Sequence, residues 1–187
     1  MTVDSRVEEI LARLAQVRAN LKVVLAPVPE AVRQRRPEAN RWSIPGVLEH
    51  LARTERRVHQ VLHEAVNASN EHAAASSDAA SYCVSYELLV DRSRRLETRD
   101  TLAAQEARNS DVVWEELQCV RNEFITFVTS TDANRLARVE RPHPVLGLIN
   151  GLQWVDFVGA HEARHTAQIV ENLEFLAAHE PWNHGVT

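Results

Sequence analysis

Two histidines in the run His161-Glu162-Ala163-Arg164-His165 are spaced for joint binding of a metal ion. Residues four apart on an α-helix lie about 40° apart around its axis, so both imidazoles can reach one ion from the same side. Imidazole nitrogen is a suitable ligand for zinc, nickel and ferrous iron. The spacing therefore predicts a divalent metal site on a helix.

The same run matches the pattern H-E-x-x-H, in which the glutamate of a metalloprotease acts as general base. Glu162 is therefore a candidate for proton transfer, although its position favours a place at the margin of the pocket or a pair with an arginine. The sequence offers no sheet edge for an extended peptide and no glycine-plus-histidine continuation after His165. We therefore expect a small-molecule substrate rather than a protein.

The histidine pair lies on the side of its helix that should face the core. Trp154, Val158 and Ile169 fall within about 80° of His161 on a helical projection. A buried neutral imidazole needs a partner for each nitrogen, which a metal, water or another side chain can supply. His50 is the best third ligand, because it lies at the edge of the apolar stripe of another predicted helix. Three protein ligands leave an open coordination position, whereas a structural zinc site normally has four.

Four segments place apolar residues at the three-and-four spacing of an amphipathic helix: residues 4–25, 43–67, 110–129 and 150–178. Ser43 is a plausible N-cap for the second of them. Residues 68–81 have little to bury and should form a surface connection, while the pattern of residues 82–108 favours neither helix nor strand. The expected fold is all-α, a four-helix bundle with a long connection between its second and third helices, in one domain over residues 1–187.

The composition argues against two classes of partner. The 21 lysines and arginines are outnumbered by 26 acids, which gives a net charge of −5 and no basic footprint for nucleic acid. No segment approaches the roughly 20 consecutive apolar residues that cross a bilayer. Cys83 and Cys119 lie far apart and are expected to be reduced structural thiols, which fits a cytoplasmic protein.

Several short motifs occur together in one order along residues 5 to 178. They are Arg41-Trp42-Ser43, Val47-Leu48-Glu49-His50-Leu51, His143-Pro144-x-x-Gly147, Gln153-Trp154 and His161-x-x-x-His165-x-x-Gln168-Ile169. In this combination the sequence resembles the YfiT-like branch of the DinB-like superfamily. The resemblance implies a four-helix bundle of unusual connectivity with a metal held by His50, His161 and His165.

The resemblance also implies an activity. Similar members include thiol S-transferases that use bacillithiol or mycothiol, a mycothiol-dependent isomerase and proteins called metal-dependent hydrolases, and homodimers are common among them. We therefore expect thiol S-transfer or hydrolysis on a small molecule, with a low-molecular-weight thiol as a possible cosubstrate. The alternative is a stress-associated dimer that binds a metal or ligand without turnover.

The other residues of these motifs are expected to pack in the core, to form structural hydrogen bonds or to line the pocket. Trp42 and Trp154 are expected to pack in the core, and Gln168 to form a structural hydrogen bond or line the pocket. The other histidines are expected at the surface, with His143 the one most worth following; they are His59, His63, His72, His143, His179 and His184.

Overall fold

Four long helices form the frame of the molecule in the computed structural model, which describes residues 3–68, 81–93 and 108–179. They are α1 (Ser5–Leu25), α3 (Ile44–Ala68), α5 (Ser110–Ser130) and α7 (Gly151–His179). Asp4 caps α1 by accepting the Arg6 N–H, and Asn109 caps α5 by accepting the Asp111 N–H. The predicted all-α four-helix bundle is confirmed, with helix ends close to those expected from the periodicity.

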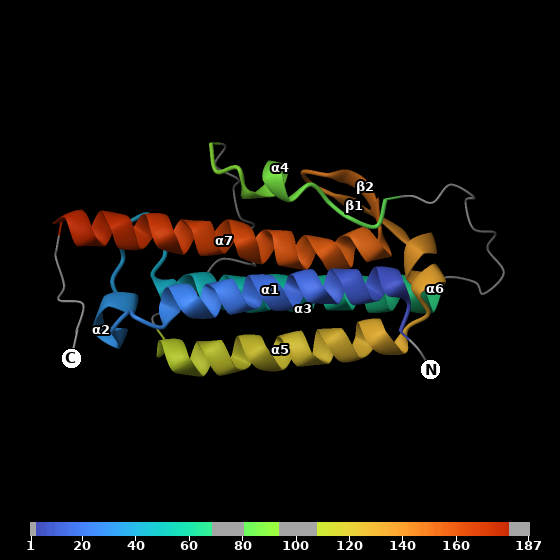
Figure 1. Ribbon diagram of the computed structural model, residues 1–187, viewed down its shortest axis with the longest axis horizontal. Helices are drawn as coiled ribbons and strands as arrows, with labels where there is room; N and C mark the ends of the chain where they lie inside the picture. The colour runs from blue at the N-terminus through green and yellow to red at the C-terminus, as the bar shows by residue number, and fades with distance from the viewer. Residues whose placement is uncertain (1–2, 69–80, 94–107, 180–187) are drawn as a thin grey trace.

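The helices do not pack in chain order. α7 packs against α1 and α3, and α5 packs against α3 and, less extensively, α1. In Figure 1, α1 and α7 run from right to left, whereas α3 and α5 run from left to right. The order around the bundle is therefore α1, α7, α3, α5, and each pair of parallel helices lies side by side. This arrangement puts α3 next to α7, the two helices that carry the candidate ligands.

Three short helices and a small hairpin complete the described fold. The helices are α2 (Glu30–Arg33), α4 (Tyr86–Val90) and α6 (Ala133–Arg138), and the antiparallel hairpin consists of β1 (Glu140–His143) and β2 (Gly147–Asn150). Gly147 has a φ of 73°, a left-handed conformation that glycine adopts without strain. The sequence did not predict α2, α6 or the hairpin, because elements of four to six residues are too short for a recognisable period.

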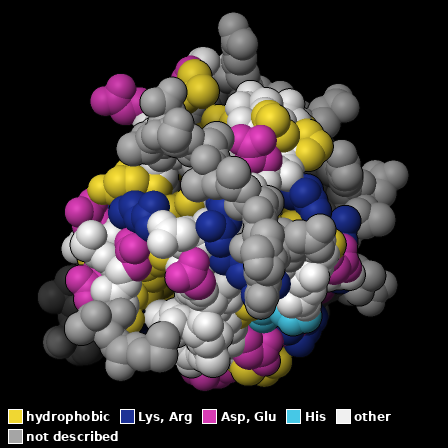
Figure 2. Space-filling view, turned by 90° about the vertical axis from the view of Figure 1, so that its right-hand side faces the viewer, with side chains coloured by type: hydrophobic (Ala, Val, Ile, Leu, Met, Phe, Trp, Pro, Cys, Tyr) yellow, Lys and Arg dark blue, Asp and Glu magenta, His cyan; other side chains and the backbone are white. Residues whose placement is uncertain are grey.

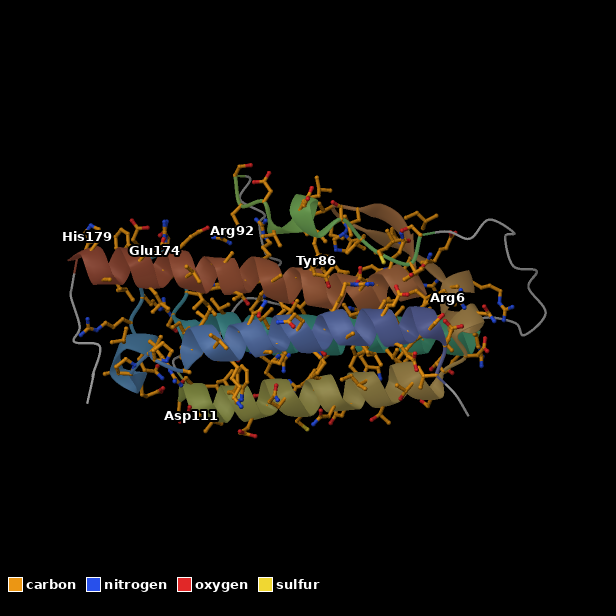
Figure 3. The ribbon with its side chains drawn as sticks, in the orientation of Figure 1. Arg6, Tyr86, Arg92, Asp111, Glu174 and His179 are labelled. Carbon is orange, nitrogen blue, oxygen red and sulfur yellow. The ribbon has the colours of Figure 1, made fainter. Side chains whose placement is uncertain are left out.

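The sequence pattern left residues 82–108 undecided, and part of this region forms the helix α4. Residues 94–107 lie outside the described part of the chain. Residues 69–80, which belong to the expected surface connection, also lie outside it. The segment 81–93 lies along α7, as Figure 1 shows. Asp156 of α7 accepts the Val84 N–H at 2.9 Å, and Arg164 donates to the carbonyl of Leu89 at 2.9 Å. Arg92, which is labelled in Figure 3, lies near the end of the segment. It donates to Glu171 of α7 at 2.7 Å.

The core consists of two apolar clusters separated by a layer of charge. One cluster joins the first half of α1 to the second halves of α3 and α5 and the start of α7, and the other joins the opposite halves of these helices. The sequence positions between them on the four helices are Arg18, Glu55, Arg121 and Glu162, all buried. We call these four residues the charged layer.

The surface has no basic face in the view of Figure 2, where acidic and basic side chains are interspersed over the described residues. Among the described helices, none combines the length and apolar character needed to cross a membrane.

Candidate metal centre

Three imidazoles from two helices converge between α3 and α7. The Nε2 atom of His161 lies 3.2 Å from the Nε2 atoms of both His50 and His165, and the three ligand atoms all lie within 4.8 Å of one another. His50 is only 4% exposed and His165 is also buried, whereas His161 is half-buried. Across residues 3–68, 81–93 and 108–179, this is the one group of three potential ligand side chains that comes together.

The separation of the His161 nitrogen from each of its two neighbours fits a shared metal ion. Tetrahedral zinc–nitrogen bonds of about 2.0–2.1 Å place their ligand atoms roughly 3.3 Å apart. The two measured separations of 3.2 Å agree with this value. Without a cation or proton between them, the lone pairs of neutral imidazoles at this distance would repel each other. The donor set and its geometry therefore suit zinc, nickel or ferrous iron.

A hydrogen bond fixes the orientation of His165. Its Nδ1 atom lies 2.7 Å from Oε1 of Gln168, one helical turn further along α7. Because an amide oxygen only accepts, Nδ1 carries the proton and the lone pair of Nε2 is directed at the other two histidines. Such a partner beyond the ligands fixes the ring and raises its basicity.

The electrostatics of the site keep His161 and His165 neutral. Burial, together with the nearby His50, lowers the pKa of His165 to about 3. Burial and the two neighbouring imidazoles also hold the pKa of His161 well below its ordinary value. Neutral imidazole is the form that binds metal, so the site is ready to do so at neutral pH.

Aromatic rings enclose the histidines. Trp42 lies 4.9 Å from the His50 ring and stacks 6.5 Å from His165, measured between ring centres. Asn172 of α7 donates to the Trp42 carbonyl at 3.2 Å, which anchors the chain two residues before α3 begins. Phe157, one helical turn before His161 on α7, lies 5.4 Å from the His161 ring. The two rings pack against the imidazoles and restrict their rotation.

His143 is buried, not exposed, so the expectation of a surface position was wrong for this residue. It is 7% exposed at the end of β1, and its ring lies 4.4 Å from Phe157. Its Nδ1 atom accepts the N–H groups of Val145 and Leu146 at 3.2 and 3.1 Å, which closes the hairpin turn. Burial lowers the pKa of His143 to about 4. The signal in the sequence was the turn motif H-P-x-x-G, in which the histidine acts as the turn acceptor.

The remaining histidines lie apart from the centre where they are described. His63 and His179 are exposed, and His59 is half-buried against Phe127 at 4.9 Å. His72 and His184 fall outside the described residues.

Comparison with known proteins agrees with this arrangement. The sequence model of the DinB superfamily matches residues 13–169, a range that includes all three converging histidines. The chain belongs to the DinB superfamily. The predicted resemblance is thus confirmed at the level of the superfamily.

Two proteins of Bacillus subtilis resemble this DinB chain, YuaE in sequence and YfiT in structure. The protein YuaE of strain 168, described as uncharacterized, is 29% identical over 140 residues, which cover 74% of this chain and 82% of YuaE. The structure of YfiT, described as a probable metal-dependent hydrolase with an unusual four-helix bundle topology, matches with a TM-score of 0.59 over 98% of this chain and 92% of YfiT. At 15% sequence identity, the likeness to YfiT shows the fold alone.

Glu162, the candidate for proton transfer, does not present a free oxygen to the histidines of this DinB chain. It is 1% exposed, and its Oε1 atom accepts Nε of Arg18 at 2.7 Å. Its Oε2 atom accepts Nη2 of Arg121, also at 2.7 Å. Both oxygens are thus engaged in ion pairs, which favours the interpretation of Glu162 as an arginine partner.

Sequence reasoning missed the partners of Glu162 in the charged layer. The signal was present, because Arg18 follows Leu14 by four residues and precedes Leu21 by three, so it lies on the apolar stripe of α1. Glu55 and Arg121 occupy equivalent positions on α3 and α5. A charge within an apolar stripe indicates a buried ion pair, but the stripe does not reveal which helix supplies the partner.

Proposed function

We propose that this protein is a metal-dependent enzyme whose centre is formed by His50, His161 and His165 and which acts on a small molecule. The observation that carries the proposal is the convergence of three Nε2 atoms, with separations of 3.2 Å from His161 to each neighbour. The proposal is further supported by the DinB superfamily match and by the description of YfiT as a probable metal-dependent hydrolase.

The proposed chemistry is attack of a nucleophile on a small electrophile, either thiol S-transfer of the bacillithiol or mycothiol type or hydrolysis by water. A divalent zinc, nickel or iron ion with three protein ligands supplies Lewis acidity that lowers the pKa of a thiol or water. The protein's own contribution is to hold the ligands, with Gln168 orienting His165 and with Trp42 and Phe157 packed against the rings of His50 and His161.

Metal analysis tests the centre. Purified protein is expected to hold one equivalent of zinc, nickel or iron, and His161→Ala should lose it, because two histidines bind far more weakly than three. The control is His179→Ala, which removes an exposed histidine from the same helix and should retain the metal. Equal metal content in wild type and His161→Ala would refute the centre.

Activity assays separate the reactions. Metal-loaded protein is offered bacillithiol, mycothiol or cysteine with a chlorodinitrobenzene electrophile, and in parallel p-nitrophenyl esters and anilides. Turnover that depends on the thiol supports S-transfer, and thiol-independent turnover supports hydrolysis; either must be lost in His161→Ala. Stoichiometric metal binding without turnover on any of these substrates would favour the non-catalytic metal-binding alternative.

We also propose that the protein is a single-domain homodimer of the cytoplasm. The support is the resemblance to dimeric relatives and the two free thiols, Cys83 and Cys119, which suit a reducing compartment. Analytical ultracentrifugation is expected to give twice the mass of one chain, and a monomer at micromolar concentration would refute the dimer.

A further inference from the structure

The charged layer is a closed network to which each long helix contributes one residue. Arg18 of α1 and Arg121 of α5 each lie 2.7 Å from an oxygen of Glu162 on α7. Arg121 also lies 2.6 Å from Glu55 of α3, and Arg18 lies 3.8 Å from the same carboxylate. All four residues are at most 8% exposed.

The signs of the charges follow the distribution of the metal ligands. The two carboxylates lie on the helices that carry histidines: Glu55 is five residues beyond His50 on α3, and Glu162 is adjacent to His161 on α7. The two arginines lie on α1 and α5, which carry no ligand. Each guanidinium therefore bridges the two ligand-bearing helices from outside that pair.

Such bridges restrain the rotation of a helix about its own axis, which apolar packing alone restrains only weakly. Side-chain tips lie roughly 5–6 Å from a helix axis, so rotating α7 by about 10° would move a ring nitrogen by about 1 Å. Apolar contacts are non-directional and resist such a rotation weakly. Arginine–carboxylate pairs are directional, and Arg121 holds Glu55 through two donors, Nε at 2.6 Å and Nη2 at 3.2 Å.

Both guanidinium groups are themselves fixed by further contacts. Arg121 also donates to the Leu14 carbonyl of α1 at 3.4 Å. Arg18 hydrogen-bonds the side chain of Gln118, and its guanidinium lies 5.7 Å from the ring centre of Trp114, both on α5. The layer is therefore a rigid reference to which α3 and α7 are both attached.

We propose that Arg18 and Arg121 are positioning residues of the metal centre, which act through Glu55 and Glu162 to set the rotation and separation of α3 and α7. The inference rests on the proposed function, because it assigns the network a role in metal binding. It also gives Glu162 a different role from the general base of the H-E-x-x-H pattern. Mispositioned ligands typically cost 10-fold to 100-fold in metal affinity, by analogy with the loss of outer-shell partners.

A variant with an uncharged layer tests whether the network positions the metal ligands or only stabilises the fold. The variant Arg18→Met, Glu55→Leu, Arg121→Met, Glu162→Leu replaces the network with apolar side chains of similar size, a change that often leaves stability equal or higher. Its fold is checked by circular dichroism and urea unfolding. Zinc affinity is measured by competition with a chromophoric chelator, and the visible absorption of bound cobalt reports the coordination geometry.

The expected result is a folded variant that binds zinc at least about 10-fold more weakly than wild type, with a changed cobalt spectrum. A folded variant with wild-type affinity and spectrum would overturn the inference. A wild-type protein that binds neither zinc nor cobalt would instead overturn the proposed function. The two failures are thus distinguishable.

If the uncharged variant does not fold, Arg121→Lys decides the question. Lysine keeps the positive charge but cannot hold both carboxylates in the geometry of a planar fork. The matched control is Arg13→Lys, because Arg13 also pairs with a buried carboxylate of α7, Asp156 at 2.9 Å, but lies outside the layer. If Arg121→Lys binds zinc more weakly than wild type and Arg13→Lys does not, the positioning role of Arg121 is supported. If the two variants have the same zinc affinity, that role is refuted.

Discussion

Replacing His143 by asparagine should make the protein less sensitive to acid. In the folded chain, burial lowers the pKa of His143 to about 4, from an ordinary value of 6.5. Its Nδ1 atom accepts two backbone N–H groups of the hairpin turn, from Val145 and Leu146. An asparagine oxygen can accept similar bonds from the residues two and three further on, so the turn should survive while the titrating group is removed.

The sign follows from proton binding. Between pH 6.5 and about 4 the imidazole of His143 is neutral in the folded state but protonated in the unfolded state. The unfolded state then binds more protons, so the free energy of unfolding falls as the pH falls. With these two pKa values, His143 costs roughly 2–3 kcal/mol of stability between pH 7.5 and 4.5. His143→Asn should escape this loss.

The assay is urea unfolding of metal-free wild type and His143→Asn at four pH values from 7.5 to 4.5. Subtracting the two curves removes the contributions of the other titrating groups, and any fixed cost of the substitution appears as a constant offset. The gap between the curves should change by roughly 2–3 kcal/mol in favour of the variant. Parallel curves would show that the pKa of His143 is not lowered in the folded state, and would refute the prediction.

Three further outcomes are expected. Gln168→Leu should weaken zinc binding by about 10-fold to 100-fold in chelator competition, since Nδ1 of His165 loses its acceptor; unchanged affinity would contradict this. Gly159→Ala should cost about 1–3 kcal/mol in urea unfolding, because the added Cβ would clash with the Tyr86 hydroxyl, and the cost should shrink in a Tyr86→Phe background. Chelator treatment should lower the thermal midpoint and zinc should restore it, except in His50→Ala.

The sequence by itself determined the four long helices. Each exceeds five turns, so its apolar period is sampled many times and its caps are local, as Asp4 and Asn109 illustrate. It also determined that His161 and His165 share one face, because their relation depends only on the geometry of their own helix. His50 could be selected as their partner through its motif and its place on an apolar stripe, but spacing alone could not show that it meets them.

Only the tertiary structure decided how the helices are combined. The contact between His50 of α3 and His161 of α7 and the engagement of Glu162 by Arg18 both join residues more than 100 positions apart. The burial of His143 depends on the packing of the hairpin against Phe157 of α7. Helical periodicity reports which face of a helix is buried but not which helix covers it. For this reason the pattern H-E-x-x-H could be found in the sequence, whereas the two arginines that pair with its glutamate could be identified only in the folded bundle.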